Sequence, residues 1–176
     1  RKLTGLLIPL DGYVRARRRK ELIESLTDCP IHLFGNGWER LPAAARNHIT
    51  IHPAVSYTEL KALIGNSRIM LSMMPHFPNG GHERIFMSML GGAVAVTDSN
   101  RYLDQTFRAG EEFVPYKLSE LRELPAKIRR LLDDSSGAEA IAAAGQAAAR
   151  RAHQWTHRAA QIVETVKFHY TFYPLK

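Results

Sequence analysis

Short apolar runs alternate with amphipathic stretches through the first two-thirds of the chain. Six apolar runs predict strands, at residues 6–8, 31–34, 49–51, 69–73, 93–97 and 113–116. Amphipathic stretches predict helices, over residues 15–26, 56–65 and 82–90. Ser56 and Glu59 have the spacing of a capping box, which opens the second of these helices. The alternation predicts an α/β domain whose mostly parallel sheet is flanked by helices.

The last third of the chain has a helical pattern. Pro125 fits a first helical turn, and the alanine-rich stretch 138–153 favours a packed helix. Thr156 is the predicted N-cap of a final helix that reaches about Phe168. The aromatic tail over 169–174 needs a cover, either from this domain or from another.

Length and composition narrow the class of protein. The 176 residues suffice for one domain, and 45% apolar with 23% charged residues is a globular mixture. A single cysteine, Cys29, excludes an internal disulfide framework and a multi-cysteine metal site. The net charge of +7 favours anionic partners such as phosphates, nucleic acid or a lipid surface, including peripheral membrane contact.

The apolar stretches and the first residues of the chain bear on where the protein is located. The longest mostly apolar stretch, 86–96, is interrupted by Ser88 and two glycines and is too short to span a bilayer. The chain opens Arg-Lys-Leu-Thr-Gly, without an initiator Met or an apolar signal region. We therefore expect a cytoplasmic protein of which this chain is one part.

Four loops follow predicted strands and are the expected ligand loops. They are residues 11–15, 35–38, 75–83 and 97–100, because ligands of parallel α/β sheets lie beyond the carboxyl ends of the strands. In the third loop Gly80 and Gly81 precede a helix start, whose free N–H groups attract anions. This predicts a phosphate cradle; an ordinary glycine turn is the alternative. Glu83 faces either a ligand or only the favourable helix dipole.

The basic run 15–20 has three interpretations. Arg15 is nearest the predicted strand end and is the best candidate for phosphate contact, with Lys20 as a second cation. A solvated helix face is the second interpretation. A nucleic-acid patch is the third, but the run has no recognition motif, zinc spacing or interleaved aromatics, so no specific nucleic acid is expected.

Two further loops carry candidate contacts. Glycines at 35 and 37 allow a close backbone approach, and Trp38 offers a flat face for a base or sugar; a turn with a half-buried Trp is the alternative. Residues 97–100 offer hydroxyl, carboxylate and amide groups to a sugar, or form an N-cap cluster. No metal is expected, because only His153 and His157 have a ligand spacing on one helix and no acidic third ligand is near them.

The run 82–98 resembles the donor-binding core of bacterial GT-B glycosyltransferases, close to the spore-maturation-protein-like branch of glycosyltransferase group 1. It shares an Arg, an apolar residue and Phe, then small residues, Gly, and a strand ending in Thr-Asp. The Gly-x-Gly-Trp turn at 35–38, the segments 57–71 and 109–114, and the His153–Arg158 segment are also similar. The resemblance covers roughly residues 3–166.

The resemblance implies a single Rossmann-like domain over 1–176, the carboxy-terminal half of a glycosyltransferase. Such a half holds a nucleotide-diphosphate sugar as substrate, needs no other cofactor, and works with a second Rossmann-like domain that binds the acceptor. Many relatives have a ribose-binding Glu where this chain has Met87, and another Glu where it has Asn79. Either Glu83 binds the ribose here or donor binding is altered, so a non-catalytic protein-interaction domain on the same fold is the alternative.

Each part of the donor is expected to bind a particular group of residues. The diphosphate is expected at the helix start, where cationic side chains and amides stabilise the departing group electrostatically. The base is expected near the Gly-x-Gly-Trp turn. The predicted donor-binding residues are Arg15, Lys20, Gly35, Asn36, Gly37, Trp38, Gly80, Gly81, His82, Glu83, Arg84, Thr97 and Asp98.

Overall fold

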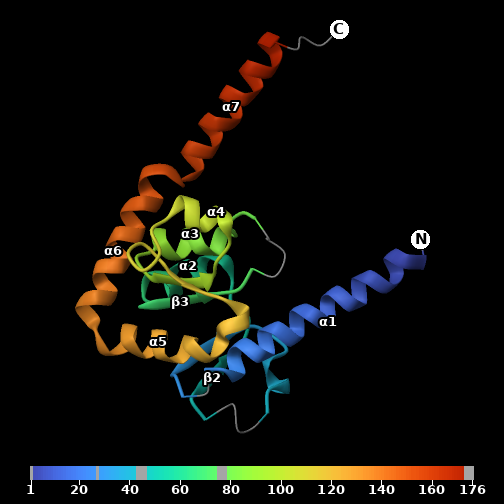
Figure 1. Ribbon diagram of the computed structural model, residues 1–176, viewed down its shortest axis with the longest axis vertical. Helices are drawn as coiled ribbons and strands as arrows, with labels where there is room; N and C mark the ends of the chain where they lie inside the picture. The colour runs from blue at the N-terminus through green and yellow to red at the C-terminus, as the bar shows by residue number, and fades with distance from the viewer. Residues whose placement is uncertain (1, 27, 43–46, 75–78, 173–176) are drawn as a thin grey trace.

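The computed structural model describes residues 2–26, 28–42, 47–74 and 79–172 (Figure 1). Its strands are β1 (Ile31–Phe34), β2 (Ile49–His52), β3 (Ile69–Ser72), β4 (Val94–Asp98) and β5 (Val114–Tyr116). Its α-helices are α1 (Lys2–Glu24), α2 (Tyr57–Gly65), α3 (Glu83–Leu90), α4 (Arg101–Thr106), α5 (Leu124–Asp133), α6 (Ser135–Ala152) and α7 (Trp155–Phe172). Short 3-10 helices cover Trp38–Arg40 and Leu118–Glu123.

All described strand pairs are parallel, which confirms the predicted α/β class. The strands form two sheets rather than one: β1 pairs with β2, and β3, β4 and β5 form a second sheet in that order. The central strand β4 is buried along almost its whole length, as expected for a strand covered on both faces. Helices flank this three-stranded sheet in the arrangement of a Rossmann-like fold (Figure 1).

The predicted strand at residues 6–8 is wrong, because these residues belong to the long helix α1. Leu6 and Ile8 are 71% and 68% exposed, and no neighbouring strand is present to pair with them within the described structure. Pro9 lies inside this helix. The predicted loop at 11–15 is therefore wrong too, and Arg15 lies in mid-helix instead of at a strand end. The helix is anchored at its other end by Leu22 and Leu26, which are buried.

The sheet β3-β4-β5 is packed on both faces. On one face, Val94 and Val96 contact the end of α1, α5 and the start of α6. On the other face, Ala95 lies in a cluster that includes Ile85 and Met89 of α3. A third, smaller cluster joins α1 to the sheet β1-β2, and its buried members are Ile23, Leu33 and Leu41. The packing therefore holds α3 rigidly against β4, and this fixes the position of the helix start.

Local signals explain the two helices nearest the site. The capping box of α2 is confirmed: the Ser56 hydroxyl accepts from the Glu59 amide, and the Glu59 carboxylate accepts from the Ser56 amide. α3 begins at Glu83 with His82 as its N-cap, close to the predicted start, and Ile85 and Met89 form its buried stripe.

The helices after β5 agree largely with the predicted pattern. Pro125 lies in the first turn of α5, and α6 covers the alanine-rich stretch. Thr156 is not an N-cap, because α7 already begins at Trp155; the His157 ring accepts from the Gln154 amide instead. α7 projects from the body of the domain, as does the amino-terminal part of α1 (Figure 1). None of the described helices is long and apolar enough to cross a membrane.

Candidate functional site

A cavity of about 350 Å³ lies between the start of α2, one face of α3 and the junction of α6 with α7. Its size is within the range of small-molecule sites. The wall combines aromatic and aliphatic side chains with one carboxylate, one guanidinium and one imidazole. The lining residues are Tyr57, Gly81, Glu83, Phe86, Met87, Leu90, His153, Trp155 and Arg158.

One face of α3 forms the floor of the cavity. Glu83, Met87 and Leu90 recur at helical spacing, so they follow one another along this face. The Tyr57 hydroxyl points toward Met87, with 3.9 Å between its oxygen and the sulfur. The Lys61 ammonium stands over the Tyr57 ring, 5.1 Å from its centre. Within the described residues, the Glu83 carboxylate makes no hydrogen bond or ion pair.

An aromatic stack forms the wall opposite α2. The His153 ring lies 5.1 Å from the Phe86 ring and 4.9 Å from the Phe107 ring. Arg158 Nη2 lies 2.7 Å from His153 Nδ1, and Arg158 Nη1 donates to Gln161 at 2.8 Å. Burial lowers the pKa of His153, and the nearby Arg158 charge lowers it further. The neutral ring can therefore accept a hydrogen bond from Arg158.

The exposed rim of the cavity is formed by Trp155. Its side chain is 81% exposed at the first residue of α7. A flat aromatic face with this exposure is available to stack on a planar or sugar ring.

Some of the backbone amides at the start of α3 already have hydrogen-bond partners within the protein. His82 Nδ1 accepts from the Arg84 amide at 3.2 Å, and the His82 amide lies 3.5 Å from the Met74 sulfur. Burial lowers the pKa of His82; the Arg84 charge lowers it further, and Glu83 acts against both. A neutral imidazole caps the helix start more effectively than a charged one, because it retains the acceptor lone pair.

The glycine loop before α3 is positioned by two contacts. Asn100 donates its side-chain amide to the Gly80 carbonyl at 2.9 Å and accepts from the Leu103 amide. Gly80 has a φ of 141°, a conformation that favours glycine. At Gly81 the reason is space: a β-carbon there would lie 2.8 Å from the Phe86 ring. Residues 75–78 of the predicted loop lie outside the described residues.

The side chains of Thr97 and Asp98 make hydrogen bonds within the protein. Thr97 is fully buried, and its hydroxyl lies 3.3 Å from Asp98 Oδ1. The same oxygen accepts from the Met74 amide at 2.7 Å, which ties the end of β3 to the end of β4. Burial raises the pKa of Asp98, whereas hydrogen bonds and the Arg18 charge oppose this. Sugar contact by these two residues stays a prediction.

The remaining predicted residues lie away from this cavity. Arg15 forms an ion pair with Asp11 at 2.8 Å, and Lys20 lies 3.7 Å from Glu24, all within α1. In the turn after β1, Gly35 and Gly37 have positive φ, Asn36 is exposed, and Trp38 is half-buried. The Trp38 ring donates to the Phe34 carbonyl at 3.3 Å.

The cavity brings together Gly81 and Glu83, which were predicted to bind the donor, with Met87 and the His153–Arg158 segment, which the resemblance singled out, and with residues that were not predicted to bind it. Tyr57 was detectable as the residue after Ser56 in the capping box, and Phe86 belongs to the run that carries the resemblance. His153, Trp155 and Arg158 come from a segment about 70 residues later in the chain. The local pattern carries no signal that brings them to α3.

Comparisons with known proteins identify the family and agree with the fold. A family model described as glycosyl transferase-like matches residues 17–164. HepE from Anabaena is similar in structure in its complexes with UDP-glucose (TM-score 0.68, 19% identity), UDP and glucose (0.66, 19%) and UDP (0.65, 18%). Each match covers 84% of this chain and 44% of HepE, so the chain spans less than half of that protein. No curated protein sequence matches the chain.

Proposed function

Because the chain belongs to the glycosyl transferase-like family, we propose that it is the donor-binding domain of a glycosyltransferase and holds a nucleoside diphosphate sugar. The observation that carries the proposal is the carboxylate of Glu83, which makes no hydrogen bond or ion pair among the described residues and lines an aromatic cavity at the start of α3. The HepE complexes support the choice of ligand, since that protein of the same fold is seen with UDP and UDP-glucose.

The nucleoside would occupy the cavity itself. The base stacks on an aromatic face, for which Tyr57 and the exposed Trp155 are available. The Glu83 carboxylate accepts hydrogen bonds from the ribose hydroxyls. Met87, one turn further along α3, cannot accept such bonds strongly, so the ribose depends on Glu83.

The diphosphate would lie at the start of α3. The helix dipole and the exposed Arg84 favour negative charge there. Arg15, the α1 cation predicted for the diphosphate, is ion-paired with Asp11, so we assign no residue of α1 to the diphosphate. Stabilising the leaving diphosphate weakens its bond to the sugar, and this is the catalytic contribution proposed for the domain.

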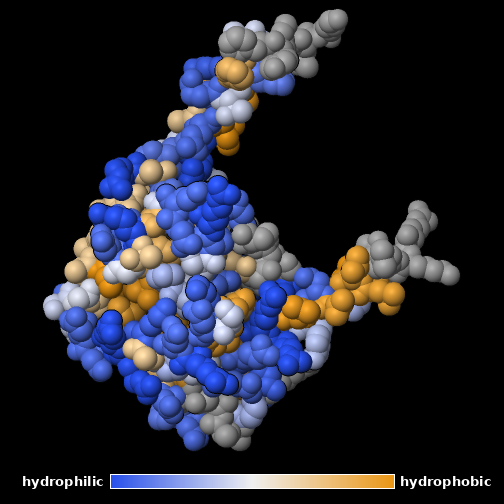
Figure 2. Space-filling model, viewed as in Figure 1, coloured by the Kyte–Doolittle hydropathy of each residue, from blue (hydrophilic) through white to orange (hydrophobic). Residues whose placement is uncertain are grey.

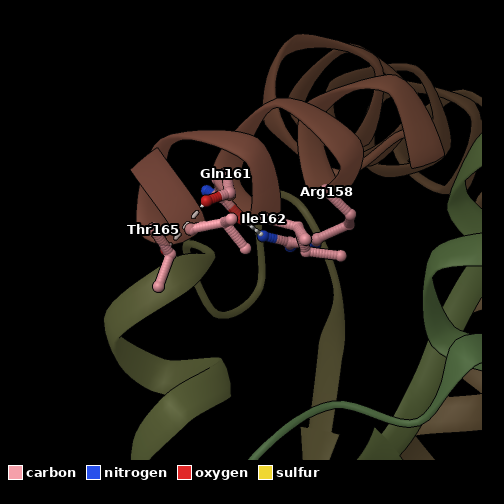
Figure 3. A pocket seen from close by; sticks show the side chains of 5 residues that line it. Arg158, Gln161, Ile162 and Thr165 are labelled. Carbon is pink, nitrogen blue, oxygen red and sulfur yellow. Dashed lines mark hydrogen bonds between the residues drawn. The ribbon is translucent and has the colours of Figure 1, made fainter. Parts of the chain in front are cut away.

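A second Rossmann-like domain would bind the acceptor and cover the projecting helices. Residues 6–8 and 10 of α1 expose a hydrophobic surface (Figure 2). On α7, a shallow hollow of about 270 Å³ is bordered by one stripe of the helix, including Ile162 and Val166 (Figure 3). Apolar surface of this kind is typical of an interface. The single-domain extent of 1–176 is part of this proposal; the cytoplasmic location and the peripheral membrane contact stay predictions.

Calorimetry tests the proposal. UDP and UDP-glucose are titrated into the intact protein, with ADP and GDP as competing bases. We expect saturable binding of at least one nucleotide, and an affinity about tenfold lower in Glu83→Gln, because a neutral amide oxygen accepts the ribose hydrogen bonds more weakly than a carboxylate. Glu139→Gln, an exposed carboxylate on α6, is the matched control and should bind as the wild type does. Absence of binding at millimolar nucleotide refutes the donor site and favours the interaction domain.

A further inference from the structure

Two histidines from neighbouring strands face each other on the sheet β1-β2. His32 Nδ1 and His52 Nε2 are 2.8 Å apart. In the parallel register His52 pairs with Phe34, so His32 lies one diagonal step away on the same face. The two residues are 20 positions apart in the chain, and the sheet alone brings them together.

One of the two rings is stacked on a neighbouring aromatic side chain, and both rings are at least partly accessible. The Phe34 ring stacks on His52 with 4.5 Å between centroids and 11° between planes. The two imidazoles lie 5.1 Å apart at 21°. Leu33 lies between His32 and Phe34 in β1 and points into the core shared with α1. The two histidines therefore occupy the opposite face of the sheet. His32 is exposed, and in the described part of the chain neither ring has another hydrogen-bond partner.

We propose that His32 and His52 form a binding site for a divalent transition metal ion such as Cu²⁺, Ni²⁺ or Zn²⁺. Imidazole nitrogen is a preferred ligand of these ions. Two metal–nitrogen bonds of about 2.0–2.1 Å at a tetrahedral angle place the nitrogens about 3.3 Å apart. The present separation of 2.8 Å is shorter than this, so both rings must turn and move apart for the ion to enter.

The chemistry of the pair suits metal binding. One ring donates its N–H to the lone pair of the other in the metal-free state. On binding, the metal accepts both facing lone pairs, and the donated proton moves to the outer nitrogen of its own ring, so both imidazoles stay neutral. No group of three or more His, Cys, Asp or Glu that could hold a metal exists among the described residues. The ion would therefore keep open positions for water or an anionic ligand.

This site is independent of the proposed donor cavity, because neither histidine lines that cavity. The histidine pair has no signature in the sequence, because its two members lie 20 residues apart on neighbouring strands and not at a ligand spacing within one helix. Its test therefore needs no nucleotide.

The experiment uses the intact, untagged protein. Zn²⁺ is titrated by calorimetry, and Cu²⁺ is added at substoichiometric amounts for electron paramagnetic resonance. His32→Ala, His52→Ala and the double variant are compared with His48→Ala, an exposed histidine just before β2. We expect one site whose Cu²⁺ spectrum shows two coupled imidazole nitrogens. Either single variant should lose that site, and His48→Ala should retain it.

Two results would overturn the proposal. One is a Zn²⁺ isotherm and Cu²⁺ spectrum unchanged in the double variant. The other is an equal loss in His48→Ala. The spectrum of the wild-type protein also decides without any variant, because a Cu²⁺ ion coordinated by fewer than two imidazoles at substoichiometric loading contradicts the site.

Discussion

The backbone of Gly81 lies directly against the ring of Phe86: a β-carbon at 81 would be 2.8 Å from Cζ of that ring. The ring cannot simply move aside, because its other neighbours are the stacked His153 ring and the Phe107 ring. The loop that enters α3 is thus held to the junction of α6 and α7 by one aromatic stack. The shape of the candidate cavity depends on this stack.

A β-carbon at residue 81 should destabilise the domain. Gly81→Ala forces the Phe86 ring from its position, and overpacking of this kind costs about 1–3 kcal/mol. Gly12→Ala in α1 is the control, since nothing lies within 4 Å of a β-carbon there. We expect Gly12→Ala to leave stability unchanged or raise it by about 0.5–1 kcal/mol. Urea unfolding measures both, and equal stability of the two variants would show that the contact is not tight.

Stability should fall on acidification because of His153. Its pKa lies below the ordinary 6.5 through burial and the Arg158 charge. As pH falls below 6.5, the unfolded chain takes up the proton first, so the free energy of unfolding decreases until the lower folded-state pKa is passed. His82 also has a lowered pKa, because it is partly buried, so its protonation decreases the free energy of unfolding in the same direction.

His153→Gln removes the His153 share of this slope. The free energy of unfolding, measured by urea at several pH values from 7.5 downward, should depend less on pH in His153→Gln than in the wild type. The exposed His48→Gln should keep the wild-type slope. Identical slopes in wild type and His153→Gln would mean that the ring is not kept neutral by its surroundings.

A carboxylate at residue 87 should strengthen nucleotide binding. Met87 lines the cavity one helical turn after Glu83, so Met87→Glu adds a second acceptor for the ribose hydroxyls. We expect about tenfold tighter binding of UDP and less or no gain for the 2′,3′-dideoxy nucleotide. Met87→Gln controls for size without charge. No gain for either nucleotide would favour a scaffold without a donor site.

Substitutions in the apolar stripe of α7 should lower stability only in the intact protein. Ile162 and Val166 are 63% and 46% exposed in this domain, so Ile162→Asp should change its stability by less than about 0.5 kcal/mol. If a second domain covers the stripe, the same substitution costs several times more in the intact protein, because a charge is buried. Ala160→Asp on the opposite face of the helix is the control. Equal effects in both proteins would argue against the interface.

The sequence predicts best where local signals decide the structure. The capping box at Ser56 and the aliphatic runs of β3 and β4 are such signals, and these elements lie where they were expected. The apolar run 6–8 indicates a strand locally, but the structure forms the helix α1 there, and burial of Leu22 and Leu26 at its far end anchors that helix. The cavity needs packing of Tyr57, Glu83 and Trp155 from three distant segments, which no local pattern encodes.

A crystal structure of the intact protein with UDP tests the central claim most directly. The account predicts that the uridine lies in the cavity formed by Tyr57, Met87 and Trp155, with the ribose hydroxyls on the Glu83 carboxylate and the diphosphate at the start of α3. UDP bound elsewhere, with Phe86 and Trp155 closed over an empty cavity, would contradict it.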